Sequence, residues 1–112
     1  MALYMFEFSY TPETWAALVK SPENREEIVR GILEDAGAKL HSLWYAFGAS
    51  DGFALLEAPD NITAASIALA IGSSGAFAKA ETHVLLSQSE TLEALEKAGE
   101  IAYAAPGAAV HA

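Results

Sequence analysis

Two histidines, His41 and His83, are the best acid–base candidates in the sequence, and each lies in a stretch typical of a strand. Because imidazole titrates near neutral pH, either side chain could take a proton from a substrate and give it back. Glu7 lies in a third such stretch, and it could orient His83 if the two stretches pair as antiparallel strands. We therefore take His41, His83 and Glu7 as the candidate catalytic residues. The structural alternative is a histidine that pairs with a carboxylate at an interface and does no chemistry.

Six further residues could bind a small molecule beside these histidines. Their charges could polarise a ligand, or their rings could line a pocket; they are Lys39, Tyr45, Phe47, Asp51, Glu57 and Glu81. Each also has a structural alternative. Lys39, Glu57 and Glu81, together with Lys79, could form cross-strand ion pairs at the rim of a sheet. Asp51 could bond to the backbone amides of its own turn, and the aromatic rings could pack in a core or an interface.

A metal site would need at least three converging ligands. Suitable donors exist, and one histidine could in principle ligate haem iron; the donors are His41, His83, Glu7, Glu57 and Glu81. They come from separate stretches and show no local spacing of His and Glu, so we predict no metal and no cofactor. The absence of cysteine excludes thiolate ligands, disulfides and thiol catalysis.

The size and charge of the chain exclude further classes. Its 112 residues suffice for one domain, and six Lys and Arg against fifteen Asp and Glu give a net charge of −9. An acidic chain lacks the basic surface that neutralises phosphates, so we predict no nucleic-acid partner. The first ten residues lack a basic signal-peptide region, and no stretch is apolar enough to span a bilayer. We therefore predict a cytoplasmic protein without a membrane partner, with one domain at residues 1–103 and a flexible tail at 104–112.

The strands and helices that must position these residues are predicted from the alternation of side chains and from residues that typically begin or end a helix. Strands are predicted at residues 3–10, 38–47, 53–58 and 76–86. Helices are predicted after Thr11-Pro12, after Ser21-Pro22 as far as Gly37, from about residue 62 to Gly72, and at 91–103. The order is β-α-β-β-α-β with an extra C-terminal helix. This order is typical of a ferredoxin-like α+β fold, with an antiparallel sheet and helices on one face.

The second face of such a sheet needs a partner. We expect the aromatic residues of strand 3–10 to lie under the helices, and apolar residues to remain on the other face: Leu3, Met5, Leu43, Tyr45, Phe47, Phe53, Leu55, Phe77 and Leu85. Glu7, Lys39, His41, Glu57, Lys79, Glu81 and His83 are expected among them. Directly opposed residues of strands 38–47 and 53–58 keep to the same face only if the connection between the two strands is an odd-length loop or contains a bulge. Such a face is too apolar for a monomer in water, so we predict a homodimer that closes a two-sheet barrel.

Several short motifs resemble those of the GYD domain family, small bacterial and archaeal proteins among the dimeric α+β barrels. They are Tyr10-Thr11-Pro12, Gly37-Ala38-Lys39-Leu40, Gly48-Ala49-Ser50-Asp51, Glu57-Ala58-Pro59-Asp60, Ala64-Ala65, Gly72-Ser73-Ser74-Gly75 and Glu81-Thr82. The resemblance covers about residues 3–90, and it departs from the family at the name-giving Gly-x-Tyr-Asp motif, where Ser50 replaces the tyrosine. It implies the dimeric α+β barrel fold and a homodimer, but no particular reaction.

Two functions fit these observations. The first is a small-molecule-binding, self-assembling α+β barrel protein, a homodimer or a higher homo-oligomer. The alternative is a small cofactor-free enzyme that transfers a proton or oxygenates a small apolar substrate, with a histidine as the base. Proteins of related fold include both enzymes and ligand-sensing modules, so the fold does not decide between the two.

Overall fold

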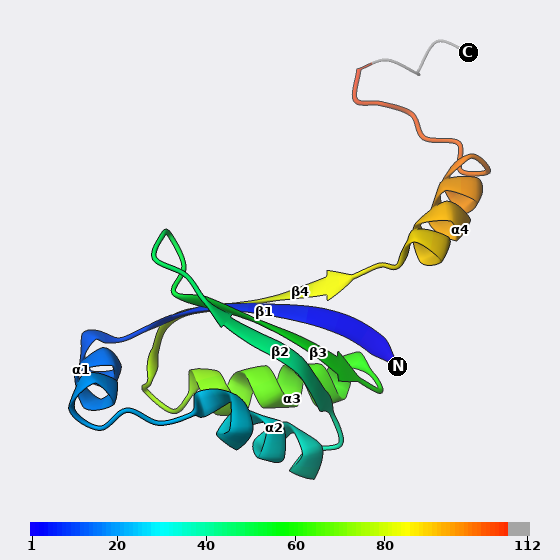
Figure 1. Cartoon of the computed structure of the whole chain (residues 1–112). Helices are drawn as coiled ribbons and strands as arrows, with labels where there is room; N and C mark the ends of the chain where they lie inside the picture. Colours follow the sequence, from blue (N-terminus) through cyan, green and yellow to red (C-terminus); the bar gives the residue numbers. More distant parts are fainter. Residues whose placement is uncertain (108–112) are drawn as a thin grey trace.

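The computed structural model describes residues 1–107 and is built on one four-stranded antiparallel sheet (Figure 1). The strands are β1 (Ala2–Tyr10), β2 (Lys39–Tyr45), β3 (Gly52–Ala58) and β4 (Phe77–Leu85), and they lie in the order β2-β3-β1-β4. This α+β fold has the ferredoxin-like arrangement that the sequence predicts. The consecutive strands β2 and β3 form a hairpin. The first and last strands of the chain, β1 and β4, pair with each other although they are far apart in the sequence.

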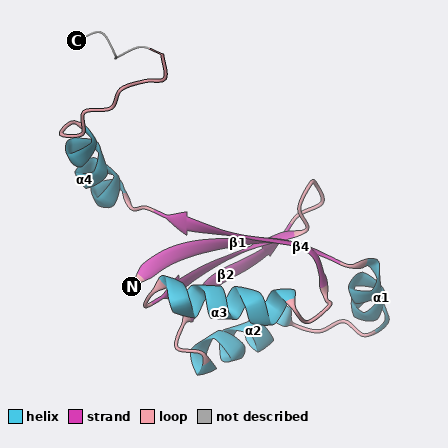
Figure 2. Ribbon diagram, turned by 180° about the vertical axis from the view of Figure 1, so that it is seen from behind, coloured by secondary structure: helices cyan, strands magenta, loops and turns pink. Residues whose placement is uncertain are grey.

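Helices α2 (Arg25–Asp35) and α3 (Asn61–Gly72) lie against the same face of the sheet, and α1 (Pro12–Lys20) lies at its end (Figure 2). The cap of α1 is Thr11, as predicted, and Asp60 caps α3. The predicted start of α2 at Ser21-Pro22 is wrong. Asn24 is the N-cap, because its side chain accepts the hydrogen bond of the Glu27 backbone N–H at 3.3 Å.

The core lies between the sheet and these helices. The aromatic side chains of β1 are buried there, as the alternation predicts: Tyr4, Phe6, Phe8 and Tyr10. From the helices, Leu33 and Ile67 pack against them, and Leu40 and Leu56 complete the layer from β2 and β3. The strong alternation of β1 thus fixes which face of the sheet the helices cover.

A bulge in β2 overturns two predicted positions. The pairing with β3 shifts between Leu40 and Ser42, so His41 is the extra residue and the side chains after it change faces. Leu43 lies opposite Ala54 and packs against the core, and Tyr45 lies opposite Gly52. Both were expected on the face without helices. Trp44 takes their place on that face, where it is 68% exposed.

A second irregularity corrects the position of Phe77. The pairing of β1 with β4 shifts between Ser9 and Tyr10, which brings Phe77 opposite Tyr10. Its ring lies 5.1 Å from that of Tyr10 and 5.4 Å from that of Phe8, on the helix-covered side. Phe47 is also misplaced by the sequence prediction, because β2 ends at Tyr45 and Phe47 lies in the hairpin loop with its side chain fully exposed.

The last helix, α4 (Gln88–Ala98), projects away from the sheet at the end of β4 (Figure 1). It begins earlier than predicted, because Ser87 and Glu90 form a capping box, and it ends at Ala98 rather than at Tyr103. None of its residues is buried. The predicted tail begins at residue 104, and its part from 108 to 112, including His111, lies outside the described residues. Within residues 1–107, no helix is long and apolar enough to cross a membrane.

Candidate functional site

The candidate site lies on the face of the sheet that the described helices leave uncovered, called the open face below (Figure 1). It consists of Leu3, Met5, Glu7, Ser9, Lys39, His41, Ser42, Trp44, Phe53, Leu55, Glu57, Lys79, Glu81, His83 and Leu85. Each of these side chains is exposed or half-buried. The glutamates, lysines and histidines predicted for this face are all on it: Glu7, Lys39, His41, Glu57, Lys79, Glu81 and His83.

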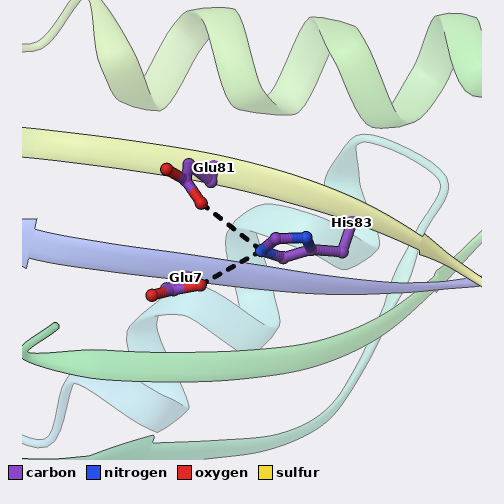
Figure 3. Close-up of side chains that lie close together, drawn as sticks. All are labelled: Glu7, Glu81 and His83. Carbon is purple, nitrogen blue, oxygen red and sulfur yellow. Dashed lines mark hydrogen bonds and ion pairs between the residues drawn. The ribbon is translucent and has the colours of Figure 1, made fainter.

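Glu7, Glu81 and His83 converge at the middle of β1 and β4 (Figure 3). Glu7 lies directly opposite Glu81 in the sheet, and His83 follows two residues later on the same face. Nε2 of His83 is 3.1 Å from Oε1 of Glu7 and 3.6 Å from Oε2 of Glu81. The expected pairing of the first and fourth strands therefore brings Glu7 to His83.

Ser50 and Lys79 hold the other oxygen of Glu7. The Ser50 hydroxyl donates a hydrogen bond to Oε2, and Lys79 Nζ lies 3.7 Å from the same oxygen and 3.4 Å from Ser50 Oγ. The hydrogen bonds from Ser50 and His83, with the nearby charge of Lys79, lower the pKa of Glu7 below its ordinary value. Glu7 is therefore a carboxylate at neutral pH, with its two oxygens held by different partners.

Ser50 contacts the open face from the β2–β3 loop, and the sequence prediction did not include it in the site. It lies in the loop between β2 and β3, it is only 4% exposed, and no alternation or charge pattern marks it. The available signal was its position, because Ser50 stands where the resemblance to the GYD domain family implies a tyrosine. A hydroxyl at this position reaches the face where the titratable residues gather.

A second pair of histidine and glutamate lies elsewhere on the open face. Nε2 of His41, at the bulge of β2, is 3.2 Å from Oε2 of Glu57 on β3. Lys39 lies opposite the same glutamate in the register of the two strands. His41 and His83 thus belong to separate clusters, and they do not combine into one catalytic site. Whether either histidine transfers a proton stays a prediction.

Three of the predicted ligand-binding residues lie away from this face. Tyr45 is on the covered side, with its hydroxyl 3.1 Å from that of Tyr10; burial, and then this hydrogen bond, raise the pKa of Tyr10. The hydrogen bonds of the Asp51 side chain go neither to the open face nor to the backbone amides of its own turn. Its Oδ2 accepts the backbone N–H of Tyr10 at 3.0 Å and the indole N–H of Trp15 at 2.9 Å, which ties the hairpin to β1 and α1. Phe47, in the hairpin loop, is the third.

The enclosed space between the sheet and helices α2 and α3 is too small for most ligands. A cavity of about 50 Å³ lies there, lined almost entirely by apolar side chains such as Val29, Leu33 and Ile71, with Arg25 at its wall. Small-molecule sites usually enclose about 300–1,000 Å³. A cavity of this size and polarity is a packing space. A wider and more open hollow of about 400 Å³ lies between α3 and β4, but no charged side chain lines it. The open face, where the charged and titratable residues gather, is therefore the better candidate for a ligand site.

Comparisons with known proteins agree with this fold without adding a reaction. Searches of curated proteins and of solved structures give no match. A family model described as the GYD domain matches residues 4–95, which is most of the chain. The matched range includes nearly all of the sheet, the residues Glu7, Glu81 and His83, and the start of α4. The chain therefore belongs to the GYD domain family.

Proposed function

We propose that this protein is a small-molecule-binding homodimer, in which the open faces of two sheets pack together and enclose the ligand site between them. The observation that carries the proposal is the composition of the open face. Half-buried Leu3, Met5, Phe53, Leu55 and Leu85 form an apolar area, and Trp44 extends it at the strand edge. Monomeric proteins rarely expose a continuous apolar surface of this kind.

A two-fold axis suits this surface because both copies would present the same patch. Leu55 is near its centre, with Met5 opposite on β1 and Ser42 opposite on β2. Packed sheets lie about 10 Å apart, which leaves room for interdigitated apolar side chains and, where polar residues face each other, for a small ligand. The expected product is the two-sheet barrel that the sequence predicts.

The polar cluster on this face would then lie inside the barrel. Glu7, Glu81 and His83, with Lys79 beside them, would be partly removed from water, where electrostatic interactions are stronger than in bulk solvent. Carboxylates outnumber the fixed positive charge of the cluster. A cationic ligand, or a neutral one that donates hydrogen bonds, therefore complements it better than an anion.

Light scattering after size-exclusion chromatography tests the assembly. We expect the wild-type chain at tens of micromolar to have the mass of a dimer. Leu55→Glu would place a charge at the centre of the interface and give a folded monomer, checked by circular dichroism. Val19→Glu is the matched control, because Val19 lies on α1, outside the open face, and is 79% exposed. A wild-type monomer, or a Leu55→Glu dimer, would contradict the proposal.

A further inference from the structure

We propose that Glu7, Glu81 and His83 bind a divalent transition-metal ion of the zinc or cobalt(II) class. Such a site would give the proposed small-molecule function a ligand class, and it rests on that function for the second copy that shields the ion from bulk water. All three donors belong to one chain, however, so binding and assembly can be measured separately. The proposal departs from the sequence prediction of no metal, since the fold brings together donors from two strands.

The separations between the donor atoms match those of a metal site (Figure 3). Nε2 of His83 is 3.1 Å from Oε1 of Glu7 and 3.6 Å from Oε2 of Glu81, and all three donor atoms lie within 4.8 Å of one another. Ligands about 2.0–2.1 Å from a zinc ion are about 3.3 Å apart in a tetrahedron and about 2.9 Å apart as octahedral neighbours. A small shift of Glu81 toward Glu7 would thus complete three positions of either geometry.

The charges of the two strands independently favour a cation here. Glu7 and Glu81 lie directly opposite each other on neighbouring strands, an arrangement in which like charges destabilise a sheet. Of the two oxygens of Glu7, Lys79 pairs with Oε2, whereas His83 contacts Oε1. When the imidazole is neutral and carries its proton on Nδ1, so that Nε2 no longer donates to Glu7, the space between Oε1 of Glu7 and Oε2 of Glu81 holds two carboxylate oxygens and one nitrogen lone pair. A divalent ion neutralises this excess of negative charge.

The residues around Glu7 also orient it for this role. Ser50 and Lys79 both engage Oε2, which leaves Oε1 turned toward His83. Metal-ligating carboxylates are commonly held by such a hydrogen bond from a neighbouring residue. The mixed set of one imidazole and two carboxylates suits borderline ions, whereas a purely carboxylate set would suit calcium or magnesium. His83 and Glu81 are about half exposed, so water could fill the remaining positions.

Isothermal titration calorimetry with Zn²⁺, and visible absorption with Co²⁺, test the site on full-length, tag-free protein freed of metal by a chelator. We expect one ion per chain. Both His83→Gln and Glu81→Gln should weaken binding by at least about tenfold. His41→Gln is the matched control, because the His41–Glu57 pair supplies one imidazole and only one carboxylate; it should bind as the wild type does.

Two further measurements distinguish a true metal site from a destabilised sheet, and metal binding from dimer formation. Lys79→Met removes a positive charge beside Glu7 and should tighten Zn²⁺ binding several-fold, which a merely destabilised sheet would not do. Light scattering on the same samples reports assembly. A dimer that binds no metal, or binding that survives His83→Gln, would overturn the metal site and leave the homodimer standing. A monomer that binds one ion through these three residues would overturn the homodimer alone.

Discussion

The hydroxyl of Ser50 donates a hydrogen bond to Oε2 of Glu7, and this contact joins the β2–β3 hairpin to the middle of β1. Ser50 is almost completely buried, although it lies in a loop. Because this buried hydroxyl donates a hydrogen bond to a carboxylate, it contributes both to the stability of the hairpin and to the orientation of Glu7. The loop is therefore part of the site rather than a connection outside it.

Ser50→Ala tests the structural part of this contact. We expect the free energy of unfolding to fall by about 1 kcal/mol, because Glu7 loses a hydrogen-bond donor that water replaces poorly at a buried position. The measurement is urea unfolding at one fixed chain concentration, since the stability of an oligomer depends on concentration. Ser66→Ala is the control, because Ser66 is exposed on α3 and bonds only to a helix carbonyl; its stability should change by less than about 0.5 kcal/mol. Equal effects of the two substitutions would contradict a special role for Ser50.

How much could be predicted from the sequence depends on the strand. In β1 the aromatic residues alternate without interruption, so the covered face and the position of Glu7 are predicted correctly. In β2 the same reasoning places Lys39 and His41 correctly but fails after the bulge at His41, because one extra residue reverses the face of all that follow. Bulges have no strong sequence signal, and the register with the neighbouring strand decides where they lie.

In the candidate site, too, the sequence predicts contacts that follow from strand pairing but not those that depend on how a loop folds. His83 and Glu7 could be paired from the sequence because antiparallel strands bring together residues far apart in the chain. The contact of Ser50 with Glu7 could not be predicted in this way, since it depends on how the hairpin loop folds back on the sheet. For Asp51 the sequence offers a ligand-binding role or, because aspartate often bonds locally, a hydrogen bond within its own turn. Its actual partners, Tyr10 and Trp15, come from another strand and a helix.

Asp51→Ala should destabilise the fold without affecting the open face. Its carboxylate accepts two part-buried hydrogen bonds, from the backbone of Tyr10 and from the indole of Trp15, and alanine offers neither donor an acceptor. We expect a loss of about 2 kcal/mol in the free energy of unfolding, measured with urea. Asp51→Asn keeps one side-chain oxygen as an acceptor and should lose less. Zn²⁺ binding by Asp51→Ala should equal that of the wild type, and a selective loss of binding would instead support the predicted ligand role of Asp51.

Leu43 and Trp44 are neighbours in the sequence, but their side chains lie on opposite faces of the sheet, so their substitutions should affect different properties. Leu43 packs against the core, so Leu43→Ala should lower the free energy of unfolding by about 2 kcal/mol and leave the dimer interface unchanged. Trp44 lies on the open face, so Trp44→Ala should weaken the dimer and leave the core intact. Urea unfolding and light scattering at several chain concentrations separate the two effects. The reverse result would mean that β2 has no bulge at His41.

Asp60 makes the cap of α3 sensitive to pH. Its Oδ1 accepts the backbone N–H of Thr63 at 2.8 Å, and this hydrogen bond lowers the pKa of Asp60 below its ordinary 3.8. The unfolded chain therefore binds the proton more tightly than the folded protein, so the charged cap stabilises the fold above pH 3.8 and loses this effect as the pH falls through the lower folded pKa. Asp60→Asn keeps a capping oxygen without a titrating group. We expect the wild type to lose more stability than Asp60→Asn as the pH falls from about 5 to about 2, measured by urea unfolding at each pH. Asn24→Ala removes the neutral cap of α2 and should cost the same at every pH; parallel curves for wild type and Asp60→Asn would show that Asp60 makes no such contribution.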